Sequence, residues 1–118
     1  PNVLLVHFND LKADLGGEMR RVADFLGVQV PEAQWPAVVE RCTFESMRER
    51  GAEIAPFEKL FEGGAKGFIF KGTNGRWKDI LTAEELETYA GRVAQLMDSD
   101  AAKWLEQGRR AVDPKQAA

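Results

Sequence analysis

Residues 68–82 read FIFKGTNGRWKDILT and carry two glycines, three cations and one tryptophan between an apolar run and a helix start. Glycine permits positive φ and lets the backbone approach a ligand closely, because it has no Cβ. Successive peptide N–H groups in such a turn form a concave anion site, which nearby Lys or Arg reinforces. The segment therefore predicts a phosphate-binding loop. The alternative is a surface hairpin with Asn74-Gly75 as its turn, and residue physics alone favours that alternative.

The composition is typical of one soluble globular domain, with 118 residues of which 44% are hydrophobic and 30% charged. The net charge of −3 argues against a general nucleic-acid binder, which needs a broad positive surface. One cysteine and one histidine exclude an internal disulfide and a Cys/His cluster, so no metal is expected. This cysteine usage predicts a reducing, cytoplasmic location. No apolar run approaches the ~20 residues that span a bilayer.

The start of the chain predicts a β-strand. Asn2–Phe8 is nearly continuous in apolar residues, which is typical of a parallel strand covered on both faces. The other strand candidate, Gly67–Phe70, is short, so the rest of the sheet is expected to lie outside these residues. Since Pro1 runs directly into the strand, the chain reads as the middle of a longer protein. His7 is expected to be a strand residue with a satisfied ring rather than a catalytic group.

Helical periodicity and cap residues predict helices for much of the remaining chain. The first expected helix begins near Leu15–Glu18 and ends at Gly27, and the second runs from Pro31 through Trp35 to Cys42. A third, short helix is expected to begin after an N-cap at Thr43. A fourth is expected from a Thr82/Glu85 capping box to Met97, followed by a final helical turn from Ser99 or Asp100. Residues 51–67, with Pro56 and Phe57, are expected to form a loop with one helical turn that orders against a ligand or partner.

Common catalytic signatures are missing from the sequence. There is no Walker-type phosphate loop, no dinucleotide fingerprint and no nucleophile turn of the G-x-S-x-G kind. Cys42 and His7 are conceivable as a nucleophile pair, but Cys42 falls on an apolar stripe and is better interpreted as a buried small hydrophobe. Trp77, between cations, is interpreted as a core anchor in preference to a base-stacking residue.

Four motifs follow one another between residues 2 and 87. They are VLLVHFNDLKAD at 3–14, CTFESM at 42–47, FIFKGTNGRWK at 68–78, and the polar set Lys78, Thr82 and Glu87. Together they resemble the C-terminal part of the PAPS-dependent sulfotransferase family, the cytosolic type in a bacterial-like variant. The matching family patterns are a strand ending in Tyr-Glu-Asp-Leu/Met-Lys, Thr-Ser-Phe-x-x-Met, Arg-Lys-Gly-x-x-Gly-Asp-Trp-Lys, and the dimerisation motif K-x-x-x-T-V-x-x-x-E, in which Ala83 replaces the valine.

The resemblance implies a role for each matching residue in binding the nucleotide of PAPS (3′-phosphoadenosine 5′-phosphosulfate). Lys71 and Gly72 would bind its 3′-phosphate, with Thr73 beside them. The residues implied to lie along the adenine are Cys42, Thr43, Phe44 and Met47.

Three positions depart from the family pattern. Phe8 stands where the family has an adenine-contacting tyrosine, so it could pack on the base but lacks the hydroxyl. Phe70 replaces the signature arginine, which removes a bidentate partner for phosphate. Arg76 replaces the aspartate, and we hypothesise that Arg76 turns toward the nucleotide and compensates for the missing arginine.

The resemblance also implies a fold and an activity for the intact protein. The fold would be α/β, a parallel sheet with flanking helices of the P-loop nucleotide-kinase-like type. Residues 1–108 would contribute one strand and several helices to this domain, and 109–118 a flexible tail. The activity would be transfer of a sulfuryl group from PAPS to a hydroxyl or amine acceptor.

The chain is expected to be inactive by itself. The family's 5′-phosphosulfate loop and general-base histidine belong to an N-terminal half that is the expected partner of these residues. A homodimer through Lys78, Thr82 and Glu87 is a further expectation. The alternative function is a non-catalytic helical interaction module, in which the segment around Lys71 is merely a turn.

Overall fold

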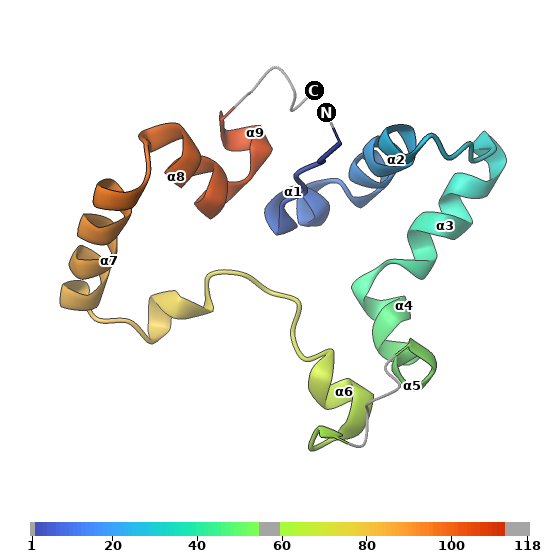
Figure 1. Ribbon diagram of the computed structural model, residues 1–118. Coiled ribbons are helices and arrows are strands. Elements are labelled where there is room, and N and C mark those ends of the chain that lie inside the picture. The colour runs from blue at the N-terminus through green and yellow to red at the C-terminus, as the bar shows by residue number, and fades with distance from the viewer. Residues whose placement is uncertain (1, 55–59, 113–118) are drawn as a thin grey trace. The chain divides into compact units, whose positions relative to one another are not determined.

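The computed structural model describes residues 2–54 and 60–112 (Figure 1). The helices are α1 (Phe8–Ala13), α2 (Leu15–Leu26), α3 (Trp35–Arg41), α4 (Phe44–Glu49), α5 (Gly51–Ile54), α6 (Gly64–Phe68), α7 (Ala83–Leu96), α8 (Ser99–Gln107) and α9 (Arg109–Val112), with 3₁₀ turns at Glu32–Gln34 and Arg76–Asp79. The chain divides into two compact units. Unit 1 combines Pro1–Asp14 with Asn74–Ala118, and unit 2 is Leu15–Thr73.

The expected strands are wrong, since no strand occurs within residues 2–54 and 60–112. Residues 2–7 have no regular structure, and the side chains of Val3 and Leu5 are 67% and 62% exposed. Gly67 and Phe68 belong to α6 instead. The physical reason is that a strand needs a neighbour to pair its backbone N–H and C=O groups. An apolar run supplies side chains for burial, but it does not supply that neighbour.

Helix α1 occupies residues that the sequence pattern did not assign to a helix. The helix begins after His7, whose Nδ1 accepts a hydrogen bond from the backbone N–H of Asn9 at 3.1 Å. It ends at Asp14, whose backbone N–H donates to the carbonyl of Asp10 at 2.9 Å. Histidine is not among the usual N-cap residues, so the helix start was not recognisable from the sequence.

Helices α2 and α3 pack together at the start of unit 2 and confirm that these two segments are helical, although Leu26, at the end of the apolar stripe of α2, is exposed. Ala23 and Trp35 are buried. The Arg20 guanidinium lies 4.5 Å from the centroid of the Trp35 ring, and it makes two hydrogen bonds with Glu32 at 2.6 and 2.8 Å. Gly27, with φ of 69°, follows the last residue of α2 as expected for a helix-ending glycine.

Helices α4, α5 and α6 complete unit 2. Thr43 caps α4, because its hydroxyl oxygen accepts a hydrogen bond from the backbone N–H of Ser46 at 3.2 Å. This confirms the predicted N-cap. Gly51 of α5 lies against Ala65 of α6, so closely that an added Cβ would be 2.6 Å from the Ala65 methyl. The loop expected over residues 51–67 thus contains two short helices, while Pro56 and Phe57 lie outside the described residues.

The second segment of unit 1 contains α7, α8 and α9. Thr82 and Glu85 form the predicted capping box at the start of α7, with the Thr82 N–H donating to Glu85 at 2.8 Å. The final turn expected from Ser99 is a longer helix, α8, capped by Asp98. Arg109–Val112 form α9, within the region that was expected to be a tail. None of the described helices is long and apolar enough to cross a membrane.

Candidate functional site

Gly72 and Phe44 bring two of the sequence motifs into contact within unit 2. Gly72 has φ of 58°, in the left-handed region that disfavours side chains. A Cβ added to Gly72 would lie 2.6 Å from Cδ2 and 2.8 Å from Cε2 of the Phe44 ring. A side chain at this position is therefore disfavoured both by the backbone conformation and by the space that the Phe44 ring occupies. The start of α4 and the Lys71-Gly72 turn are adjacent, as a common binding site requires.

Lys71 and Phe70 lie at the surface beside this contact. Both side chains are exposed, and the Lys71 ammonium lies 4.9 Å from the centroid of the Phe70 ring. An ammonium over an aromatic face is attracted to the ring and keeps its other side open to solvent. Thr73 is also exposed. The turn thus presents one accessible cation next to a glycine in the left-handed conformation, which is a combination suited to an anion.

The Thr43 hydroxyl is already engaged by the helix start. It donates to the Glu40 carbonyl at 2.9 Å and accepts from the Ser46 N–H at 3.2 Å. Cys42 is exposed, so the expectation of a buried Cys42 is wrong. The reason is that Cys42 is the C-cap of α3 and lies past the end of its apolar stripe. Met47, on α4, is 41% exposed.

Phe8 and Arg76, the remaining two predicted binding residues, belong to unit 1. Phe8 is the first residue of α1, and its side chain is half-exposed. Arg76 begins the 3₁₀ turn that follows Gly75, whose φ is 79°. Trp77, next to Arg76, is 48% exposed and carries the Lys78 ammonium 5.7 Å from its ring centroid. Trp77 is therefore not buried in a core formed by the described residues, and its interpretation as a core anchor is wrong.

Two of the three residues of the expected dimer motif, Lys78 and Thr82, have other contacts within the chain. The Thr82 hydroxyl accepts from the Glu85 N–H at 3.3 Å, as part of the capping box. Lys78 lies over Trp77. Glu87 is exposed on α7. A homodimer through these residues stays a prediction.

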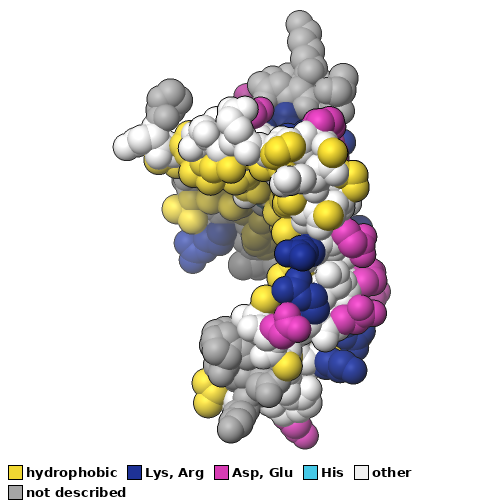
Figure 2. Space-filling view, turned by 90° about the vertical axis from the view of Figure 1, so that its right-hand side faces the viewer, with side chains coloured by type: hydrophobic (Ala, Val, Ile, Leu, Met, Phe, Trp, Pro, Cys, Tyr) yellow, Lys and Arg dark blue, Asp and Glu magenta, His cyan; other side chains and the backbone are white. Residues whose placement is uncertain are grey.

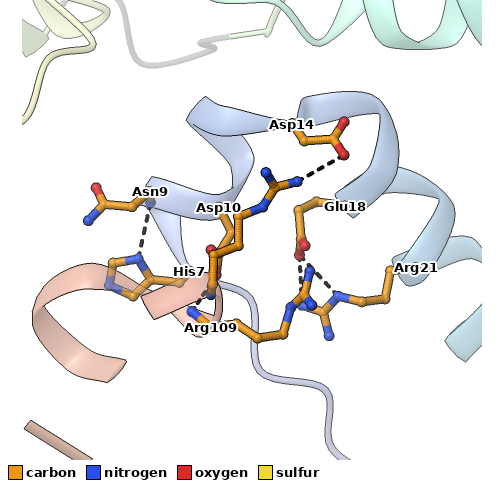
Figure 3. A network of polar contacts seen from close by, with 8 residues as sticks. His7, Asn9, Asp10, Asp14, Glu18, Arg21 and Arg109 are labelled. Atoms are coloured by element: carbon orange, nitrogen blue, oxygen red, sulfur yellow. Dashed lines mark hydrogen bonds and ion pairs between the residues drawn. The ribbon is translucent and has the colours of Figure 1, made fainter. Parts of the chain in front are cut away.

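A network of polar contacts around α1 was not predicted from the sequence (Figure 3). The Asp10 carboxylate is 1% exposed and accepts hydrogen bonds from the backbone N–H groups of Arg109 at 2.8 Å and Arg110 at 3.3 Å. Gly108 precedes them with φ of 95°, and an added Cβ would lie 2.9 Å from both carboxylate oxygens. Asp10 thus holds the start of α9. No local sequence signal could have found a contact that spans 99 residues.

Burial and hydrogen bonding shift the pKa of the Asp10 carboxyl in opposite directions. Burial raises the pKa of this carboxyl, but the two backbone N–H groups of Arg109 and Arg110 lower it. The charge of Arg109 lowers the pKa further, and the net pKa lies below the ordinary value of 3.8. Asp10 is therefore a charged, structural residue of unit 1.

The His7 ring is satisfied, as predicted, although not within a strand. Its Nδ1 accepts from the Asn9 N–H at 3.1 Å, while Nε2 lies 2.9 Å from the Leu105 carbonyl oxygen. Because a carbonyl only accepts, Nε2 carries the hydrogen. The ring also packs edge-on against Trp104, with centroids 5.4 Å apart. Both nitrogens are occupied, so neither serves as a base for Cys42.

A groove of about 430 Å³ between α7 and α8 does not suit a phosphate. The residues that line it are Tyr89, Ala90, Val93, Ala94, Met97, Asp98, Ser99, Ala102 and Glu106. Burial, together with a hydrogen bond to Glu106 and its negative charge, raises the pKa of Tyr89. The lining thus has two carboxyl groups and no cation, which disfavours an anionic ligand.

Charge elsewhere on the described surface is mixed. On the face shown in Figure 2, Lys and Arg side chains lie beside Asp and Glu side chains and form no broad basic area. In the described parts of the chain, no three His, Cys, Asp or Glu side chains gather in a way that could hold a metal ion. Two places in the described chain combine an exposed cation with an adjacent glycine in the left-handed conformation, Lys71 with Gly72 and Arg76 with Gly75, and of these Gly72 also lies against the Phe44 ring.

Comparison with known proteins identifies relatives of the whole chain. It is 34% identical to the glycolipid sulfotransferase of Mycobacterium bovis (strain BCG / Pasteur 1173P2) over 116 residues, which are 97% of this chain and 35% of the relative. The same values hold for the glycolipid sulfotransferase of Mycobacterium tuberculosis (strain ATCC 25618 / H37Rv). Identity to sulfotransferase 1A1 of Rattus norvegicus is 28% over 98 residues, 80% of this chain and 33% of the relative. No solved structure matches the chain.

The chain spans about a third of the length of these relatives. The family model described as "Sulfotransferase domain" matches residues 1–100, which include the Phe44–Gly72 contact, Lys71 and the capping box of α7. With most of the chain matched in this way, the protein belongs to the sulfotransferase family.

Proposed function

We propose that the intact protein transfers a sulfuryl group from PAPS to a hydroxyl or amine acceptor, and that this chain binds the nucleotide. Sulfotransferases of this family generally use PAPS as the donor, and the family implies an α/β fold of the P-loop type. The observation that carries the proposal for this chain is the contact between Phe44 and Gly72. It places the Thr43–Met47 motif beside the Lys71-Gly72 turn, where one nucleotide could reach both.

The Lys71-Gly72 turn is proposed to bind the 3′-phosphate. The exposed Lys71 ammonium supplies a point charge with three hydrogen-bond donors. Gly72 supplies a backbone N–H in the left-handed conformation that occurs in anion-binding turns, and its lack of a Cβ leaves room for the Phe44 ring. Thr73 follows with an exposed hydroxyl. Because Phe70 cannot donate to phosphate, we expect Lys71 to contribute a large share of the affinity.

The start of α4 is proposed to face the adenine. Phe44 lies against Gly72, and an aromatic ring there offers a surface on which a base can pack. Met47 and Cys42 add soft, exposed contacts nearby in the chain. Since the Thr43 hydroxyl is engaged with Glu40 and Ser46, Thr43 contributes by starting α4 and not through its hydroxyl. Phe8 is proposed as a further adenine contact.

Sulfuryl transfer requires groups beyond those described here. PAPS supplies an activated sulfuryl group. The acceptor oxygen or nitrogen must form a bond to sulfur and lose a proton to a base, while the bond from sulfur to the 5′-phosphate oxygen breaks. His7 cannot be that base, because both of its ring nitrogens are occupied. We propose that the base and the 5′-phosphosulfate loop come from another part of the domain, and that this chain alone is inactive.

Alanine substitution of Lys71 tests the proposal directly. In the intact protein, Lys71→Ala is expected to weaken binding of 3′-phosphoadenosine 5′-phosphate by at least about tenfold, because a charge-assisted hydrogen bond contributes about 1.5–3 kcal/mol. Isothermal titration calorimetry measures the affinity. Lys66→Ala is the matched control, since Lys66 is also an exposed lysine of unit 2. No heat with the unsubstituted protein, or equal affinity of Lys71→Ala, would favour the helical interaction module.

Arg76 is proposed to compensate for the arginine that Phe70 replaces. If Arg76 contacts the nucleotide, Arg76→Ala should weaken binding of 3′-phosphoadenosine 5′-phosphate by about five- to tenfold, and less at high salt, because exposed charge pairs are screened. Titrations at low and high ionic strength measure both effects. Arg48→Ala, which removes an exposed arginine of α4, is the control. Unchanged affinity in Arg76→Ala would dismiss this role.

A further inference from the structure

Asn9 and Asn74, which we call the asparagine pair, connect α1 to the residue that follows Thr73. The Nδ2 group of Asn74 donates a hydrogen bond to Oδ1 of Asn9. The Nδ2 group of Asn9 donates in turn to the backbone carbonyl of Glu106 in α8, at 3.1 Å. The backbone N–H of Asn9 donates to Nδ1 of His7, also at 3.1 Å. Asn9 therefore holds Asn74 and is itself held by two other residues.

Only a carboxamide meets both demands on the Asn9 side chain. The Glu106 carbonyl can only accept, so the donor group Nδ2 must face it, and Oδ1 is left to accept from Asn74. A carboxylate would lack the donor, and a leucine of similar size would lack both groups. The requirement is therefore specific to the amide and does not reflect size alone.

Asn74 has a particular place in the chain. It directly follows the Lys71–Thr73 segment and lies between two glycines with positive φ, Gly72 at 58° and Gly75 at 79°. Glycines give the unfolded backbone large conformational freedom, so a segment between them is costly to order. A hydrogen bond at Asn74 restricts this backbone at the end of the proposed phosphate-binding segment.

We infer that the asparagine pair positions the Lys71–Thr73 segment for the nucleotide. The inference rests on the proposed function. Fixing Asn74 on α1 means that part of the ordering entropy of the segment is lost on folding, and less remains to be lost on binding. Asn9 and Asn74 touch no phosphate in this role, so they are positioning residues and not catalytic ones.

Leucine substitutions in the intact protein test the inference, with Asn2→Leu as the matched control because Asn2 is exposed. Asn9→Leu and Asn74→Leu are each expected to raise KM for PAPS by about three- to tenfold with kcat little changed, since one neutral hydrogen bond contributes about 0.5–1.5 kcal/mol. The double variant should resemble Asn9→Leu, because Asn9→Leu already removes the bond to Asn74. Asn74→Gln keeps the donor and should restore part of the affinity.

Hydrogen exchange of the backbone amides of Gly72, Thr73 and Gly75 gives a readout that needs no nucleotide. We expect these amides to exchange faster in Asn9→Leu and Asn74→Leu, and unchanged in Asn2→Leu. Unchanged exchange in the leucine variants, or additive effects on KM in the double variant, would overturn the inference. If the unsubstituted protein binds no nucleotide, the proposed function fails, whereas the exchange comparison still decides whether the pair orders the segment.

Discussion

Gly72→Ala is expected to weaken binding of 3′-phosphoadenosine 5′-phosphate by at least about thirtyfold, from a left-handed penalty of about 1–2 kcal/mol and an overpacking cost of about 1–3 kcal/mol. The left-handed penalty arises because φ at Gly72 is 58°. The overpacking cost arises because the new Cβ would lie 2.6 Å from the Phe44 ring. Either the turn or the ring must move, and both belong to the proposed site. Calorimetric titration of the intact protein measures the loss.

Two further variants separate these causes. Gly64 has φ of 61° with nothing within 4 Å of an added Cβ, so Gly64→Ala carries the conformational cost without the clash. Phe44→Ala combined with Gly72→Ala removes the clash and keeps the conformational cost. We expect the double variant to bind better than the sum of the single effects predicts. Full affinity in Gly72→Ala would show that the Phe44–Gly72 contact does not belong to the binding site.

Asp10→Ala is expected to lower the free energy of unfolding of unit 1 by about 2–4 kcal/mol, because two backbone N–H groups lose a charged acceptor. These groups belong to Arg109 and Arg110 at the start of α9. Denaturant titration followed by circular dichroism measures the change. Asp14→Ala is the control: Asp14 pairs with Arg110 at 3.0 Å but is 48% exposed. An exposed pair contributes at most about 1 kcal/mol, so equal losses in the two variants would contradict the assignment.

The lowered pKa of Asp10 also predicts a dependence of stability on pH. The folded state binds the Asp10 proton less tightly than the unfolded state. The contribution of the Asp10 carboxylate to the free energy of unfolding is therefore fully present at pH values above its ordinary pKa of 3.8. This contribution is lost as the pH falls through the lower pKa that Asp10 has in the folded state. The stability difference between the unsubstituted chain and Asp10→Ala should therefore shrink at acid pH. A stability difference between the two proteins that stays constant down to the lowest pH at which the chain folds would contradict this prediction.

Local signals in the sequence predicted most of the helical structure. Thr43, the Thr82/Glu85 pair and Gly27 act within one helical turn, and the structure confirms each of them. The strand at Asn2–Phe8 was wrong because an apolar run is compatible with a strand but does not require one. Strand formation depends on pairing with a distant segment, and no such partner occurs among the described residues.

The candidate site was predictable in residue identity but not in geometry. Motif order singled out Gly72 and Phe44, yet nothing in their spacing predicts that the ring closes over the glycine. Asp10 and the asparagine pair were missed, because their partners lie far along the chain and carry no local pattern. Asn74 and Gly75 were interpreted only as a possible turn, whereas the Asn74 side chain donates a hydrogen bond to Asn9.

The attachment of α9 to Asp10 has a consequence for the order in which unit 1 can fold. The contact joins residues 99 positions apart, and all of Leu15–Thr73 lies between the two segments of the unit. Closing a loop of that length costs about 4 kcal/mol by the logarithmic chain-entropy relation. During synthesis, α1 leaves the ribosome long before α9 exists, so unit 2, which is continuous in sequence, can fold first. We expect the two segments of unit 1 to join late, and we expect a circular permutant that fuses them to fold faster.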